Sequence, residues 1–344
     1  MNRFSVVSAA VLFQLVSVVY AQDIKPIRDN VGFCWDPVQM TRLIDYLKKI
    51  EKEHPMPAKI VAAISPHDDY LYAARVYYPL YRTLRAKEVV IFGVTHGDVR
   101  SEIGDPHNIL ILDNYKEWPG LVKDVGISPL REYIKAHLDT SYFIVSYKAH
   151  ALEHSIEALV PFIQYFNPDA KIVPIMVTQM PFGRMDTISD HLSSIISDYI
   201  KVNHLVPGKD IAFLVSSDAD HYGPDFNNSP YGEDEKAHAE ATANDRRIAH
   251  KDLDGVLTSE KVYDLTNEMK NTLWCGKFSV PFGLLTSEKV VMKTNGKELD
   301  GKLIRYSDSY SEGVIPLKGT GMGTTAPASY KHWCGWLSEA FYLK

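Results

Sequence analysis

Two short apolar runs, each followed by a histidine, constrain this chain more than any other feature. Residues 59–64 are almost all apolar and lead to His67, and residues 88–94 lead to His96. Between them, residues 70–84 are long enough for a crossover helix, so the pattern predicts strand, helix, strand, the unit that builds parallel sheets. We therefore expect both histidines at the carboxyl ends of neighbouring strands, the edge where open α/β sheets bind ligands.

A third apolar run, residues 211–215, leads through Asp218 to His221. Imidazole binds metal ions and changes its charge near neutral pH. Three histidines at one sheet edge therefore indicate a metal site or an acid/base site. Carboxylates near them fit either reading, because they orient metal-bound imidazoles or bind the metal themselves. For Asp68 and Asp69, which follow the first histidine, a solvated loop or a helix cap is the alternative.

Further periodic segments complete a layered fold. A strand is predicted at residues 171–177 and an amphipathic helix at 186–202. Four strands with helical crossovers imply a three-layer α/β/α sandwich with a largely parallel or mixed central sheet. The other predicted elements are helices at 38–52, 153–163, 235–249 and 262–273, and short strands near 108–112, 142–145, 290–293 and 303–307.

The first 21 residues have the pattern of a secretory signal peptide. Arg3 precedes a mostly apolar run, and small residues at Val19 and Ala21 predict cleavage after Ala21. The alternative is an uncleaved membrane anchor. Residues 22–344 are then expected to form a single α/β domain, exported to the periplasm or the extracellular space.

Charge and hydropathy argue against two classes of partner. Removing Arg3 with the signal changes the formal charge from -6 to -7, and the chain has no long basic run, so there is no electrostatic case for nucleic acid. No later segment is long and apolar enough to cross a bilayer. The ligand class, small molecule or peptide, is left open.

Three cysteines are an odd number for an oxidising compartment. Cys34 and Cys334 are the candidates for a disulfide, which leaves Cys275 for a metal ion. Cys275 precedes a helix predicted to begin near Pro281, and a thiol near a helix start is acidified and becomes a soft metal ligand. The alternative is a small buried apolar residue.

Glu153 and His154 open the helix predicted at 153–163, in which Pro161 should end or kink the helix. A glutamate at that end interacts favourably with the helix dipole, and a histidine there is kept neutral and able to bind a metal. The other histidines stand in polar contexts that predict surface positions: His107, His137, His191, His204, His238 and His250.

Six motifs occur in the order seen in the Memo family, which the chain resembles over most of residues 30–310. They are Gly32-Phe33-Cys34-Trp35-Asp36-Pro37, Ser65-Pro66-His67, Gly93-Val94-Thr95-His96, Glu153-His154-Ser155-Ile156-Glu157, Ser216-Ser217-Asp218-Ala219-Asp220-His221-Tyr222-Gly223 and Cys275-Gly276-Lys277. The family includes the bacterial and archaeal AmmeMemoRadiSam system protein B. It resembles the class III extradiol dioxygenases in fold, which implies a LigB-like α/β/α sandwich.

The resemblance implies a metal ion bound by His67, His96 and Cys275. Copper or iron are the usual candidates, and zinc is less expected. A redox-active or oxygenase-like metalloenzyme is the favoured function. A non-catalytic module that holds metal or peptide is the first alternative. The second is a hydrolase, in which zinc activates water.

The resemblance also implies a pocket around that ion. His221 and Asp218 would lie in it, with His221 as a proton donor or acceptor. Glu153 and His154 would help to form the pocket. Asp68 would add negative charge beside the metal, at a position where family members commonly carry an apolar residue followed by glycine.

Overall fold

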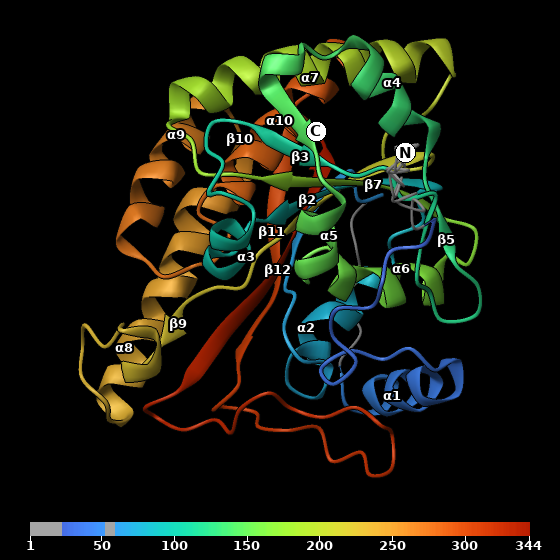
Figure 1. Ribbon diagram of the computed structural model, residues 1–344. Coiled ribbons are helices and arrows are strands. Elements are labelled where there is room, and N and C mark those ends of the chain that lie inside the picture. The colour runs from blue at the N-terminus through green and yellow to red at the C-terminus, as the bar shows by residue number, and fades with distance from the viewer. Residues whose placement is uncertain (1–22, 52–58) are drawn as a thin grey trace, which may run out of the picture.

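The computed structural model describes residues 23–51 and 59–344 (Figure 1). The predicted signal peptide, residues 1–21, lies outside this part of the chain. The strands are β1 (Ala62–Ser65), β2 (Glu88–Val94), β3 (Leu110–Leu112), β4 (Glu117–Trp118), β5 (Val125–Gly126), β6 (Phe143–Val145), β7 (Lys171–Val177), β8 (Ile211–Ser216), β9 (His221–Tyr222), β10 (Gly255–Leu257), β11 (Leu299–Asp308) and β12 (Trp333–Leu343). The α-helices are α1 (Pro37–Ile50), α2 (Tyr70–Tyr81), α3 (Gly97–Glu102), α4 (Pro129–His137), α5 (Tyr147–Leu152), α6 (Val160–Phe166), α7 (Phe182–Val202), α8 (Glu235–Ile248), α9 (Ser259–Glu268) and α10 (Ser279–Asn295).

One large mixed sheet forms the middle layer. Its strand order is β10-β11-β12-β1-β8-β2-β7-β3-β6, with β9 paired to β12. The four central strands β1, β8, β2 and β7 are parallel, and antiparallel pairs flank them on both sides. Because β8 pairs with both β1 and β2, the prediction that His67 and His96 follow neighbouring strands is wrong. The chain crosses from β1 to β2 past a gap in the sheet, and β8, which comes later in the sequence, occupies that gap.

Helices cover both faces of this sheet. Successive strand residues point to opposite faces: Val89 and Ile91 belong to one apolar core, and Val90 and Phe92 belong to the other. The first core lies under α1, α2 and α6, and the second lies under α4, α7, α9 and α10 (Figure 1). The three-layer α/β/α sandwich with a mixed central sheet is thus confirmed.

Most predicted elements are confirmed within a few residues, and β2 and β7 have the predicted bounds. The strand predicted at 290–293 is wrong, because Val290 and Val291 lie inside α10 and are fully buried there. Their β-branched side chains favour a strand locally, but the packing of α10 against α7 and β8 outweighs that preference. The closing strand β12, which lies between β11 and β1, was not predicted at all.

The helix predicted at 153–163 begins later than predicted, with a 3-10 turn at Glu157–Leu159 that leads directly into α6. Its predicted start is wrong, because Ser146 caps the short helix α5 and Glu153 follows the last residue of that helix and donates its N–H to the carbonyl of Ala149. The α-helical part, α6, begins at Val160. Pro161 then occupies its first turn, where the missing N–H of proline costs nothing.

Within residues 23–51 and 59–344, no helix has both the length and the apolar character that crossing a bilayer requires.

Candidate metal centre

Three chain segments leave the carboxyl ends of the central strands close together. His67 follows β1, Asp218 follows β8 and His96 follows β2. Because β8 is the middle strand of the three, its last residue Ser216 and then Asp218 stand between the two histidines. The site therefore includes contributions from all three strands that the sequence marked.

His67 is held in a defined tautomer. Its Nδ1 lies 2.7 Å from Oγ of Ser216, and that hydroxyl donates its own proton to the carbonyl of Ser155 at 2.6 Å. The hydroxyl oxygen must therefore accept from Nδ1–H of His67, which leaves the lone pair of Nε2 free. The ring is 1% exposed, so its orientation is fixed by these contacts and by the surrounding side chains.

Glu153 holds His96 in the same way. Nδ1 of His96 lies 2.9 Å from Oε1 of Glu153, and the backbone N–H of His96 donates to Oε2 at 3.0 Å. A carboxylate can only accept, so Nδ1 carries a proton and Nε2 is the ring atom left to bind a metal ion, once it has lost any proton of its own. This pairing of carboxylate and imidazole is the one that orients histidines in metal sites. Glu153 performs it from the end of α5, not from the start of a helix.

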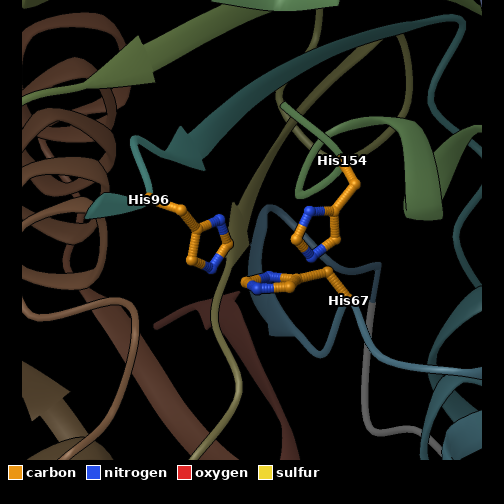
Figure 2. Close-up of side chains that lie close together, drawn as sticks. All are labelled: His67, His96 and His154. Atoms are coloured by element: carbon orange, nitrogen blue, oxygen red, sulfur yellow. The ribbon is translucent and has the colours of Figure 1, made fainter. Parts of the chain in front are cut away.

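His154 completes a cluster of three rings (Figure 2). Its ring stacks on that of His96, with centroids 4.7 Å apart and planes inclined by 7°. Both rings meet His67 nearly at right angles, at 5.2 and 5.5 Å. The backbone N–H of His154 donates to Oε1 of Glu153 at 2.9 Å, so one buried carboxylate positions both stacked histidines.

Cys275 reaches the site from the segment that precedes α10. Its Sγ lies 3.4 Å from Nε2 of His67 and accepts the backbone N–H of Asp218 at 3.0 Å. The next residue, Gly276, allows this close approach. A Cβ added there would lie 2.2 Å from Oγ of Ser217, so any other residue would displace the thiol.

Two groups of potential ligands result within the described residues. One comprises His67, His96 and His154, and the other comprises His67, Asp218 and Cys275; the ligand atoms of each group lie within 4.8 Å of one another. The three predicted ligands are thus divided between two groups that share His67. His154 and Asp218, predicted as pocket and catalytic residues, are also placed at ligand distance.

The spacing of these atoms fits a metal ion. Two atoms bound to one tetrahedral ion at roughly 2.0–2.3 Å lie roughly 3.5 Å apart. Nε2 of His67 is 3.4 Å from Sγ of Cys275 and 3.5 Å from Oδ2 of Asp218. Imidazole nitrogen, thiolate sulfur and carboxylate oxygen together suit copper, iron or zinc.

The cluster shifts the pKa values of its members in different directions. Burial, together with charge on His96 and His154, holds the pKa of His67 well below its ordinary value, so its ring is neutral. Burial alone would also lower the pKa of His96, but Glu153 and Cys275 raise it well above the ordinary value. Burial and then Asp218 raise the pKa of the Cys275 thiol. A bound cation supplies the positive charge that stabilises the thiolate.

A cavity of about 410 Å³ opens beside the cluster. Its lining includes His221 and two aspartates that follow the first histidine, Asp68 and Asp69. Oδ2 of Asp68 accepts from the indole of Trp336 at 3.0 Å. Asp69 accepts from the N–H of Thr325 at 2.6 Å, and burial followed by the charge of Asp68 raises the pKa of Asp69 to about 7. Both aspartates are therefore held by the C-terminal part of the chain rather than by solvent.

His221 lies on β9, which pairs with β12. The centroid of its ring lies 5.1 Å from that of Phe226. It shares the cavity with Asp218 and His67. Burial holds the pKa of His221 below its ordinary value and that of Asp218 above it, and the charge of Asp68 adds to the shift of Asp218. Both predicted proton-handling residues are thus in the same cavity as the candidate ligands.

The predicted disulfide between Cys34 and Cys334 is wrong, because all three cysteines are free thiols. The Cys34 thiol donates to the carbonyl of Asp36, whereas Cys334 lines the cavity beside His67. Spacing along the chain carries no information on which thiols meet, so the sequence could not exclude this pair.

Sequence reasoning missed several residues of the site. Ser216, Cys334 and His332 were not assigned to it, although Ser216 directly follows the strand predicted at 211–215 and so was detectable. The six histidines named as surface residues are exposed, apart from His238, which is half-buried and paired with Asp308. The surface prediction for the remaining histidines is wrong for His150, which is 1% exposed and lies near the carbonyl of Ile111.

Comparisons with known proteins support the resemblance to the Memo family. Residues 34–314 match the family model described as Memo-like protein. The chain is 32% identical over 169 residues to a MEMO1 family protein of Saccharolobus islandicus, which covers 47% of this chain and 53% of that protein. It is 30% identical over 167 residues to one of Methanosarcina barkeri, with 48% and 56% covered. These matches span only about half the length of either relative.

Proposed function

Because the chain belongs to the Memo-like protein family, we propose that it binds one redox-active metal ion, copper or iron, and acts as an exported metalloenzyme. His67, His96 and Cys275 are the proposed ligands. The observation that carries the proposal is the approach of the Cys275 thiol to within 3.4 Å of the free Nε2 of His67. That distance is the one two ligands of a single ion adopt.

The protein's own groups define what such a centre can do. Ser216 and Glu153 hold the two imidazoles with Nε2 toward the centre. Asp218 and His221 line the adjoining cavity, where both can exchange protons with a bound substrate. A bound copper or iron ion supplies electron transfer or oxygen activation.

Metal analysis of anaerobically purified protein tests the ligand assignment. We expect about one equivalent of metal in the wild type and its loss in His67→Ala and in Cys275→Ala. His137→Ala, at an exposed position on α4, and Cys34→Ala, outside the cluster, serve as controls that retain the metal. Unchanged metal content in both site variants would show that the ligands are elsewhere.

The identity of the metal separates the alternative functions. Oxygen uptake with catechol-type phenols by the iron-loaded protein supports the oxygenase. Zinc together with ester or amide cleavage favours a hydrolase. Tight copper binding without turnover favours a non-catalytic module.

Export is a second part of the proposal, and the apolar run that precedes Ala21 supports it. Peptide mapping of the secreted protein should find Gln22 at the amino terminus. Recovery of the chain inside the cell with its first 21 residues attached would contradict this part.

A further inference from the structure

Two neighbouring cavities lie beyond His96 and Cys275, and the smaller of them adjoins the candidate metal centre. The smaller, about 290 Å³, is lined by His96 and Cys275 and also by Arg100 and Lys277. The larger, about 500 Å³, extends from the end of β7 to α9. They share three lining residues, Gln179, Lys277 and Phe278, so a ligand near the metal ligands in one cavity can continue into the other.

Two cationic side chains, Lys277 and Arg100, line the smaller cavity, and each has a donor group without a hydrogen-bond partner within the described residues. Lys277 is half-buried and forms no hydrogen bond or ion pair with the described residues; Asp220 acts on it only through its field. Arg100 forms an ion pair with the exposed carboxylate of Asp105, 3.7 Å from its Nε, but within the described residues that Nε is buried without a hydrogen-bond partner. A half-buried ammonium without a partner, such as that of Lys277, is costly unless an anion joins it.

The larger cavity has a different character. Apolar and aromatic side chains form much of its wall, among them Met180, Phe182, Tyr263 and Phe278. Such a surface binds an apolar or aromatic body through burial. The one further cation there, Lys270, is hydrogen-bonded to Asn267.

We propose that the two cavities together bind a carboxylate with an apolar body. The carboxylate pairs with Lys277 and Arg100 in the smaller cavity, beside His96 and Cys275, and the body lies in the larger cavity. This assignment rests on the proposed function, because it names the substrate class of the same centre. A planar carboxylate matches the fork of an arginine and the point charge of a lysine.

Calorimetric titration with 3-phenylpropionate tests the charge requirement. The neutral isostere 3-phenylpropanamide is the matched probe, and the acid should bind about tenfold more tightly, a difference of about 1.4 kcal/mol, because a charge-assisted contact is stronger than a neutral one. Equal affinity of acid and amide, or no binding of the acid up to its solubility, would overturn the proposal.

Three variants locate the binding. Lys277→Gln should weaken binding of the acid by about tenfold while leaving the affinity for the amide unchanged. Lys236→Gln, at an exposed position on α8, removes the same charge elsewhere and should change nothing. Asn267→Trp, which fills the larger cavity from α9, should abolish binding of both probes. Full binding in either cavity variant would refute the assignment.

Metal content, measured on each sample, keeps the two proposals separable. Lys277→Gln should retain its metal. Binding of the acid that depends on Lys277 in a protein without metal would refute the metalloenzyme and leave the subsite standing. Full metal occupancy with no preference for the acid would refute the carboxylate subsite and leave the metal centre standing.

Discussion

Sγ of Cys275 lies 3.4 Å from Nε2 of His67, although 208 residues separate them in the sequence. The contact joins the segment before α10 to the end of β1, across the end of β8. Each partner is held by its neighbours, His67 by Ser216 and Cys275 by the N–H of Asp218. The centre is therefore preorganised by the fold.

Glu153→Gln should lower metal affinity while leaving the fold intact. Glu153 accepts Nδ1–H of His96, and glutamine has the same shape without the negative charge. Loss of such an orienting carboxylate typically lowers metal affinity by about 10–100-fold. Competition with a chromophoric chelator measures the change. Glu132→Gln, exposed on α4, is the control, and equal affinities of the two variants would contradict the role of Glu153.

Gly276→Ala should both destabilise the protein and weaken metal binding. The added methyl would lie 2.2 Å from Oγ and 2.4 Å from Cβ of Ser217, so the segment that carries Cys275 must shift. Overpacking of this kind costs about 1–3 kcal/mol. Urea unfolding in the presence of a chelator, together with metal titration, measures the two effects.

Gly183→Ala provides the matched control for that substitution. Gly183 lies in α7, and a Cβ there meets no atom within 4 Å. Because alanine favours helices over glycine, a gain of about 0.5–1 kcal/mol is expected with unchanged metal binding. Equal changes in unfolding free energy and in metal affinity for the two alanine variants would contradict the expected clash with Ser217.

Asp245→Asn should reduce the pH dependence of stability. Asp245 accepts from the indole of Trp274 at 2.6 Å and from the hydroxyl of Tyr306 at 2.7 Å. Burial, and then the charge of Asp220, raise its pKa from 3.8 to about 7. The folded state thus binds a proton that the unfolded state releases. This stabilisation is complete below the unfolded pKa, is lost at about 1.4 kcal/mol per pH unit between the unfolded and the folded pKa, and is gone once the pH has risen through the folded pKa.

Urea unfolding at pH 5 and pH 7.5, with a chelator present, measures this effect. The wild type should lose stability between the two values, and Asp245→Asn should lose clearly less. Asp264→Asn, at an exposed position on α9, should follow the wild type. Parallel curves for all three proteins would show that Asp245 is ionised in the folded state.

Local sequence patterns predicted the central strands well. The bounds of β2 and β7 agree with the prediction, because a continuous buried run followed by a turn is visible within a few residues. The same patterns failed where local preference and packing disagree, as for Val290 and Val291 in α10. They also failed at Glu153, where a capping interpretation was plausible but the helix lies on the other side of the residue.

The sequence by itself determined which strands form the core and which histidines follow them, since apolar runs and helical periodicity are local properties of the chain. Only the tertiary structure decided that β8 separates β1 from β2, that Glu153 orients His96, that Cys334 is a free thiol and that Lys277 faces a cavity without a partner among the residues the structure describes. These relationships depend on contacts between segments far apart in the chain. Their energies arise from burial and charge after folding, which no local pattern encodes.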